Sequence, residues 1–404
     1  MKNETPSLLS PPPAGRGNHR LESRSRRGGG DSLTRRLWRQ IVPQLIATRI
    51  AWLMLLTILL LCAASLAAVR ICGPLRLPRQ EIHLVIGAVF LLLALIPAYP
   101  RLGRVAYLFY AFTCVLLIGV LLAPAIKGSH RWFLLPGGAD FQPSELAKIS
   151  FVMAVAWSLR WHRDCRDLSK LIVPFLLMLV PMGLILVESD LGTALLFPPV
   201  LYAMLIAAGA RFRYLIAIAL IALAVAPGCY PLLRGYQKQR IVALFASGKP
   251  SPAQLSGNLY QRRQSEIALG SGGLLGRGLR GADQIRHDLL PEAANDFIFS
   301  VVGSQWGFAG CMTILALYGV FFAACMEIAG NCADSFGRLM VVGLSSMMVL
   351  QATINMAMTT GLIPVVGITL PFMSYGGSAL VADMLATSLI LNVAMRQRHH
   401  SGPP

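Results

Sequence analysis

Charged residues are scarce in this chain: only 13% of its 404 residues are Asp, Glu, Lys or Arg, whereas 55% are hydrophobic. A typical soluble domain has about 25% charged residues, so this composition excludes an ordinary soluble enzyme. It indicates a polytopic membrane protein in which apolar helices make up most of the chain.

The sequence also lacks the groupings that a zinc site or a disulfide framework usually needs. Its 8 cysteines include no C-x-x-C pair, and its 7 histidines form no H-E-x-x-H or comparable motif. Four cysteines lie within apolar runs, where cysteine usually serves as a small core residue: Cys62, Cys114, Cys311 and Cys325. The sequence therefore offers no recognisable metal or redox motif.

Acidic residues are half as frequent as basic ones, with 18 Asp and Glu against 36 Lys and Arg and a net charge of +18. Such a charge can indicate a nucleic-acid partner, but the cations concentrate in the first 49 residues and in short loops between apolar runs. This is the pattern of the positive-inside rule, so we expect no nucleic acid. We expect residues 1–45 to be a basic, disordered cytoplasmic tail and residues 396–404 a second cytoplasmic tail.

Ten apolar runs divide residues 46–395, and a helix needs about 20 mainly apolar residues to cross a bilayer. The runs lie near 46–69, 82–98, 105–125, 146–159, 171–188, 193–209, 214–231, 298–326, 339–360 and 378–395, the fourth being short. With the N-terminus inside, ten spans also place the C-terminus inside. The predicted fold is all-α, with about ten transmembrane helices and one long external loop, near 232–297, between the seventh and eighth.

Four polar segments fall on the external side of this topology. They are residues 130–148, residues 188–194, the end of the long loop at Asp296, and residues 361–378. Chance does not readily place four such segments on one membrane face. We therefore expect them to line one cavity.

Asp296 lies where the long loop enters the membrane, directly before Phe297 and an apolar run. A charge costs roughly 2.5–3.5 kcal/mol at the bilayer centre and less at its rim, so an acid in this position usually has a chemical role. Asp296 is the leading candidate for a catalytic residue.

The segment FQPSELAK has the features of a helix N-terminus. Gln142 can cap the helix, Pro143 suits its first position, and Glu145 can reach back to the N–H of the cap residue. Glu145 and Lys148 are also three residues apart, so they can form a pair on the helix surface. That structural role and a role in the site are equally open.

Two further segments each allow a structural and a functional interpretation. Asp190 can cap the following helix by accepting an N–H bond from Gly192 or Thr193, or it can position a cation or a sugar hydroxyl. The prolines and glycines of residues 361–378 exclude a continuous helix, and non-helical backbone at membrane depth must be buried in protein or line a cavity. Ser374 and Tyr375 therefore either present hydroxyls to that cavity or stabilise a turn.

The long loop contains a helix-like segment, NLYQRRQSEIAL, followed by the glycine-rich stretch 270–278. No strand precedes these glycines, so a dinucleotide-binding motif is excluded. They form either a flexible loop or, together with Arg277 and Arg280, a set of N–H groups that approach a pyrophosphate.

In these segments the chain resembles the SEDS family (shape, elongation, division and sporulation) of RodA, FtsW and SpoVE-type peptidoglycan glycosyltransferases. The resemblance covers about residues 45–395 and rests on Arg-Trp followed by FQPSELAK, then DLGTA, QSEIALGSGGLLGRG, PEAANDFIFS and LPFMSYGGS, in family order. It implies that the family's catalytic acid falls on Asp296. It also implies substrate-binding roles for the other motif residues, namely Arg131, Trp132, Glu145, Lys148 and Asp190.

The sequence departs from the family pattern in places. Ala294 and Asn295 replace the usual His-Thr before the catalytic acid, Ser304 and Gln305 replace two glutamates after it, and Ser189 replaces the proline before Asp190. The segment PVVG, residues 364–367, is more typical of RodA than of FtsW.

The resemblance implies polymerisation of lipid II at the outer face of a bacterial cytoplasmic membrane, for cell elongation or division. The leaving pyrophosphate would be stabilised by Arg240, Arg277 and Arg280 or by a divalent cation such as Mg²⁺ or Mn²⁺, and the sequence does not choose between them. The expected partner is a class B penicillin-binding protein, a transpeptidase.

Two other functional classes stay open. A lipid II flippase would also need a polar cavity within the membrane, although it needs charges accessible from both sides, whereas the polar segments here lie on one. A non-catalytic scaffold of a cell-wall synthesis complex would not need Asp296.

Overall fold

The computed structural model describes residues 49–73, 76–124, 131–135, 139–161, 168–225, 258–278 and 292–396, with isolated positions at 228, 235, 238 and 290. The predicted tails, residues 1–45 and nearly all of 396–404, lie outside the described residues.

The described chain consists mainly of helices and contains one short hairpin. Its helices are α2 (Arg49–Cys72), α3 (Leu77–Ala94), α4 (Tyr99–Arg104), α5 (Ala106–Leu121), α6 (Pro143–Leu159), η1 (Leu168–Leu171), α7 (Ile172–Val187), α8 (Leu191–Ala207), α9 (Phe212–Val225), α11 (Asn258–Ser271), α13 (Ile298–Asn331), α14 (Ser335–Thr359) and α15 (Gly377–Arg396). The hairpin pairs β1 (Phe133–Leu135) with β2 (Ala139–Phe141) in antiparallel register, Phe133 opposite Phe141.

Each of the ten predicted spans coincides with one of these helices, so the all-α, polytopic membrane fold is confirmed. Among the described residues, six helical stretches are long and apolar enough to cross a membrane, and α5, α8 and α9 are shorter apolar helices. The span predicted to be short is α6, with 17 residues. The helix-like segment of the long loop is α11.

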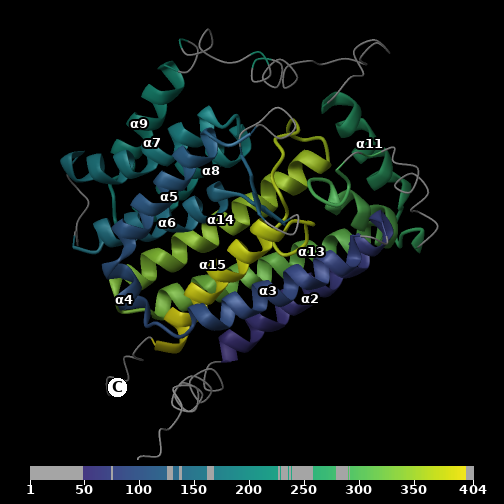
Figure 1. The fold of residues 1–404 in the computed structure, drawn as a ribbon, viewed down its shortest axis with the longest axis horizontal. Coiled ribbons are helices and arrows are strands. Elements are labelled where there is room, and N and C mark those ends of the chain that lie inside the picture. The colour runs from purple at the N-terminus through teal and green to yellow at the C-terminus, as the bar shows by residue number, and fades with distance from the viewer. Residues whose placement is uncertain are drawn as a thin grey trace, which may run out of the picture.

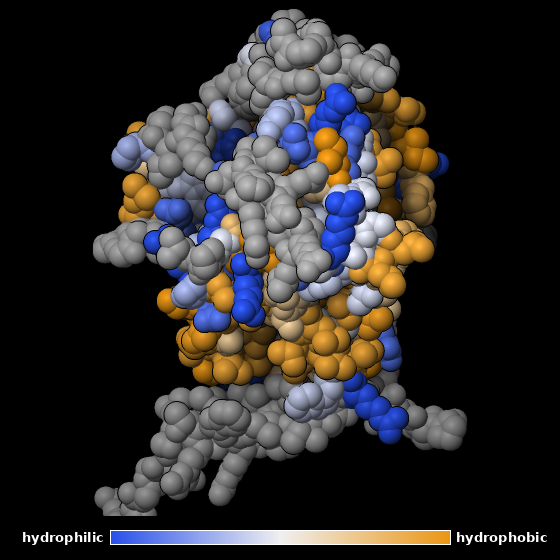
Figure 2. Space-filling model, turned by 90° about the vertical axis from the view of Figure 1, so that its right-hand side faces the viewer, coloured by the Kyte–Doolittle hydropathy of each residue, from blue (hydrophilic) through white to orange (hydrophobic). Residues whose placement is uncertain are grey.

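The helices differ in how they are buried. Figure 1 shows α14 and α15 in the middle of the bundle, with α2 and α3 along one side and α5 to α8 along the other. Most residues of α6 and α15 are buried, whereas α3 and α9 expose most of their apolar side chains. Figure 2 shows a broad hydrophobic surface on one face of the molecule with hydrophilic residues gathered above it, as expected of a bundle that sits in lipid.

Helix α13 is broken at Gly307, whose φ of 66° lies in the left-handed region. The break frees backbone groups of α13, and the glycine-rich stretch 270–278 supplies partners for them. The N–H of Phe308, for example, donates to the carbonyl of Gly273 at 2.9 Å. The contact is so close that a Cβ at Gly272 would lie 1.9 Å from a carbonyl oxygen of α13. The glycines therefore form a structural clamp on α13.

The segment between α14 and α15, residues 361–376, is irregular and largely buried. The predicted interruption of the helix is therefore confirmed, and so is its burial in protein. Its chain reversals place the start of α15 at the same end of the bundle as the end of α14.

Candidate functional site

The four polar segments meet at one end of the bundle. Ser378, at the start of α15, accepts the N–H of Gln142 at 3.1 Å, and the Gln142 side chain donates to Asp190 at 3.2 Å. The N–H of Tyr375 donates to the carbonyl of Ala294 at 2.8 Å, which joins the irregular segment to the end of the long loop. The predicted convergence of the four segments is therefore confirmed, and a cavity lined by them stays a prediction.

Asp190 is both a helix cap and a charge partner. Its Oδ1 accepts the N–H of Thr193 at 3.2 Å and its Oδ2 accepts the Thr193 hydroxyl at 2.9 Å, so it caps α8 as one of the two interpretations predicted. Nη1 of Arg131 lies 3.9 Å from Asp190 Oδ1. The same guanidinium donates to the carbonyls of Glu188, at 3.3 Å, and Ser189. These acceptors hold Arg131 in one orientation beside the carboxylate.

Glu188 is a buried acid that the sequence did not single out. It is 1% exposed, and neither carboxyl oxygen has a hydrogen-bond partner among the described residues. Burial, reinforced by the nearby carboxylate of Asp190 and opposed by Arg131, raises the pKa of Glu188 from 4.5 to about 8. The direction of this shift follows from burial, because an unpaired buried carboxylate is costly.

Glu145 and Lys148 form the predicted pair, with Lys148 Nζ 2.9 Å from Glu145 Oε2. The expected surface location is wrong: the two side chains are 8% and 3% exposed, because α6 is enclosed by its neighbours. Asp383 of α15 interacts electrostatically with both, so three buried charges lie together.

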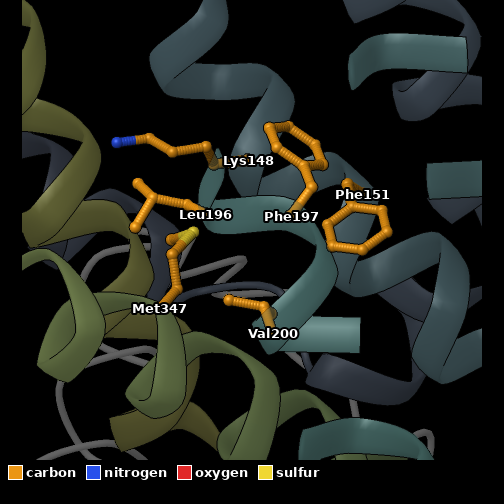
Figure 3. Close-up of a pocket in the computed structure, with 6 residues that line it drawn as sticks. All are labelled: Lys148, Phe151, Leu196, Phe197, Val200 and Met347. Carbon is orange, nitrogen blue, oxygen red and sulfur yellow. The ribbon is translucent and has the colours of Figure 1, made fainter. Parts of the chain in front are cut away.

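An apolar floor lies beneath Lys148, and the space within it is too small for a water molecule. Figure 3 shows the Lys148 amine directed away from the residues of this floor, which are Phe151, Leu196, Phe197, Val200 and Met347. The lysine thus extends its apolar stem over the floor and carries its charge toward the acids.

The predicted capping box of α6 is wrong in part. Gln142 occupies the N-cap position and Pro143 begins the helix, as predicted, but the Gln142 side chain makes no capping hydrogen bond. The N–H of Gln142, however, donates to Ser378 instead of Glu145. Glu145 is engaged by Lys148 and does not turn back toward the cap.

Asp296 lies in the turn before α13, and its backbone is held from both sides. Its N–H donates to the carbonyl of Glu292 at 3.1 Å, and its carbonyl accepts from Asn355 at 2.8 Å. Asn355 is fully buried and also donates to the carbonyl of Ile368 at 2.7 Å. A Cβ at Gly367 would lie 3.4 Å from Asp296 Oδ2. The carboxylate therefore faces the irregular segment between α14 and α15.

Ser374 has the turn-stabilising role that the sequence left open. Its hydroxyl donates to the carbonyl of Asn295 at 2.5 Å and accepts the N–H of Leu370 at 2.7 Å. Tyr375 is half-buried, and its ring centroid lies 5.8 Å from that of His83. The Ser374 hydroxyl and the backbone N–H of Tyr375, which donates to the carbonyl of Ala294, thus support the turn that carries Asp296.

The other predicted binding residues are less constrained. Trp132 is half-buried beside β1, and Arg277 is exposed, with its backbone N–H donating to the carbonyl of Ser304 at 3.1 Å. Arg240 and Arg280 lie outside the described residues. Substrate binding by these residues stays a prediction.

Asp383, Asn355 and Glu188 are the residues of the site that sequence reasoning missed. A signal existed for Asp383, because an acid inside an apolar membrane helix marks a functional site by default. Asn355 lies in a run of ordinary helix residues, and only its contacts with two distant carbonyls reveal its position.

A divalent cation finds no ready-made site in the described part of the chain. No three His, Cys, Asp or Glu side chains there stand close enough together to hold a metal ion. A divalent cation therefore stays a prediction.

Comparison with known proteins identifies the fold and the family. The family model for cell cycle proteins of the FtsW, RodA and SpoVE type matches residues 43–399. The chain is 36% identical over 329 residues to a probable peptidoglycan glycosyltransferase FtsW from Geobacter sp. (strain M18), covering 80% of this chain and 87% of that protein. It is 34% identical over 307 residues to the peptidoglycan glycosyltransferase MrdB of Escherichia coli K12, covering 76% and 81%.

Two solved structures are similar over most of their length. A chain from a peptidoglycan synthase complex that coordinates polymerization and crosslinking superimposes with a TM-score of 0.73 at 29% identity, covering 85% of this chain and 97% of that one. The rod shape determining protein RodA of Thermus thermophilus superimposes with a TM-score of 0.65 at 28% identity, covering 86% and 97%. The chain therefore belongs to the FtsW, RodA and SpoVE family of cell cycle proteins.

Proposed function

We propose that the protein is a peptidoglycan glycosyltransferase that polymerises lipid II at the outer face of the cytoplasmic membrane. The observation that carries the proposal is the position of the Asp296 carboxylate, at the junction of four polar segments on one end of a membrane-spanning bundle. The names of the FtsW and MrdB relatives support the reaction class.

The proposed chemistry is an inverting glycosyl transfer. Asp296 takes the proton from the 4-hydroxyl of an acceptor GlcNAc while that oxygen attacks the anomeric carbon of the donor MurNAc. The bond to polyprenyl pyrophosphate breaks, and the pyrophosphate leaves with its lipid. Asn355 and Gly367 serve this step by fixing the backbone of Asp296 and by leaving room beside its carboxylate.

Binding of the charged substrate is assigned to the cations nearest this end of the bundle. Arg131 is held rigidly by carbonyls and by Asp190, so little conformational entropy is lost when it binds a phosphate. Lys148 is pre-positioned by Glu145 in the same way. Arg277, exposed on the clamp, and Arg240 and Arg280 are the candidates for the departing pyrophosphate.

The proposed orientation follows from the cations at the opposite end. Arg49 begins α2, Arg211 precedes α9, and Arg104, Arg160 and Arg396 follow or end α4, α6 and α15. By the positive-inside rule that end faces the cytoplasm. Both termini are then cytoplasmic, and the Asp296 end faces outward. The partner that fits this activity is a class B penicillin-binding protein, in keeping with the similarity to a chain of a synthase complex.

The test is polymerisation by the purified protein in liposomes that contain lipid II, with and without such a transpeptidase. We expect glycan strands on a gel in the presence of the partner. A lipid II flippase would instead transfer labelled lipid II between leaflets without forming strands, and a scaffold would do neither. Absence of polymer with every partner tried, together with efficient flipping, would replace the proposed activity by transport.

A further inference from the structure

We propose that a second ligand site lies at the opposite end of the bundle and binds the headgroup of a zwitterionic phospholipid such as phosphatidylethanolamine. The site, here called the rim pocket, is a cavity of about 380 Å³ between the α3–α4 connection, the start of α14 and the end of α15. Tyr99, Cys332, Asp334 and Arg396 are among the residues that line it. Its location separates it from the Asp296 end of the molecule.

One wall of the rim pocket is held rigid. Asn392 is fully buried, and its side chain donates to the carbonyls of Ala94 and Pro97 at 3.1 and 2.7 Å and accepts the N–H of Tyr99 at 3.0 Å. One turn later, Arg396 donates from Nη2 to the carbonyl of Leu95 at 2.8 Å. The connection between α3 and α4 is thus fastened to α15 before any ligand arrives.

The pocket carries one cation and one anion that do not pair with each other. Nη1 of Arg396 is buried and has no hydrogen-bond partner among the described residues. Asp334 uses Oδ2 to accept the N–H of Gly337 at 3.0 Å as the cap of α14. It also interacts electrostatically with Arg160 and with the Tyr99 hydroxyl, but no ion pair of this carboxylate within 4 Å is found in the described part of the chain. Opposite charges that share a cavity without meeting fit a ligand that carries both signs.

The dipolar headgroup supplies the two complementary charges. Its phosphate accepts hydrogen bonds from Arg396, and charge-assisted bonds of this kind are the strong ones. Its ammonium group pairs with Asp334, which a purely anionic headgroup would face with repulsion. Exposed Arg101 interacts electrostatically with Arg396. Its positive charge therefore also favours a phosphate beside Arg396.

The position and size of the cavity favour a lipid over a bound water cluster. The pocket opens where α3, α14 and α15, three of the candidate membrane spans, begin or end, which is the depth of lipid headgroups. Its volume is roughly ten times the share of about 30 Å³ that one water molecule occupies in the liquid. Basic pockets between membrane helices on the cytoplasmic side are known to recognise headgroups.

The test measures lipid binding to the purified full-length protein by native mass spectrometry, with phosphatidylethanolamine and phosphatidylglycerol as the two ligands. Wild type should bind phosphatidylethanolamine more tightly. Arg396→Gln should weaken both lipids by roughly tenfold or more, the usual effect of losing a hydrogen bond to a charged group. Asp334→Asn keeps the helix cap, because Asn caps as well as Asp, and should abolish only the preference for phosphatidylethanolamine.

Arg211→Gln is the matched control, because it removes an exposed cation from the same end of the bundle, outside the pocket lining. It should change neither affinity. Equal binding of the two lipids by wild type, or an unchanged preference in Asp334→Asn, overturns the proposal. So does equally effective competition by soluble glycerophosphoethanolamine, which would show that a free headgroup and not a membrane lipid is the ligand.

Discussion

Helices α15 and α3 lie side by side and are both apolar, yet 78% of the most apolar stretch of α15 is buried in the protein and only 17% of that of α3. The same contrast between enclosed and lipid-facing helices is found elsewhere in the molecule. The enclosed helices α6, α14 and α15 carry buried polar side chains, including Lys148, Asn355 and Asp383, whereas α3 presents a row of Leu, Ile and Val to lipid. Enclosed helices can hold charges because neighbouring side chains replace water. The buried charged side chains of this protein therefore lie where lipid does not reach.

The largest expected effect tests whether Asp296, at the end of the bundle where the four polar segments meet, is the catalytic base. Asp296→Asn keeps the shape of the side chain and removes the base, so glycan synthesis should fall by a factor of about 100 to 10,000, while lipid II binding persists. The measurement is strand formation from lipid II with the partner present. Glu327→Gln, an exposed acid-to-amide change on α13, is the control and should keep full activity. Equal rates for Asp296→Asn and wild type would remove Asp296 from the catalytic role.

The second prediction contrasts a buried ion pair with an exposed one. Lys148→Met leaves the carboxylates of Glu145 and Asp383 buried without their cation, so unfolding free energy should fall by about 3–5 kcal/mol. Glu266→Gln breaks the pair of Arg262 and Glu266, which is 34% and 43% exposed, and should cost at most about 0.5 kcal/mol. Thermal unfolding in detergent measures both. Similar small losses would mean that Lys148 is not enclosed in solution.

The third prediction concerns how tightly the site end is packed. A Cβ at Gly192 would lie 2.8 Å from the carbonyl oxygen of Val366, so Gly192→Ala should displace the irregular segment and cost about 1–3 kcal/mol, with a loss of polymerisation. Gly183, on α7, has nothing within 4 Å of its position for a Cβ. Gly183→Ala should be tolerated. If both variants melt together and retain activity, the close contact at Gly192 is not required.

The last prediction concerns a gradual effect, the pH dependence of stability that Glu188 introduces. Its pKa is raised from 4.5 to about 8 in the folded protein, so the folded state holds a proton that the unfolded state has released between these values. Stability should therefore fall with rising pH across this window, by at most about 1.4 kcal/mol per pH unit, and level off above it. Glu188→Gln should flatten the melting temperature between about pH 6 and about pH 8 relative to wild type. If the melting temperatures of wild type and Glu188→Gln change with pH in the same way, the raised pKa of Glu188 is contradicted.

Several features of this protein were predictable because they depend on nearby residues. The ten spans follow from the length of apolar runs, the interruption at 361–376 from its prolines and glycines, and the cap at Asp190 from the residues that follow it. Asp296 was found because it stands at a boundary between a polar loop and an apolar run. These features depend on two local effects: backbone groups must form hydrogen bonds, and a charge in hydrocarbon is costly. Both effects can be judged from a few neighbouring residues.

Other features were decided only by the tertiary structure, because they depend on which distant segments pack together. The sequence placed Glu145 and Lys148 in one helix, but their burial follows from the helices that surround α6. The glycine-rich stretch became a clamp only because α13 breaks at Gly307, and Asn355 gained its role from carbonyls on two other segments. The hydropathy of a helix shows how apolar it is, but not which of its neighbours it packs against. Which charged side chains lie close together therefore depends on the packing of the helices.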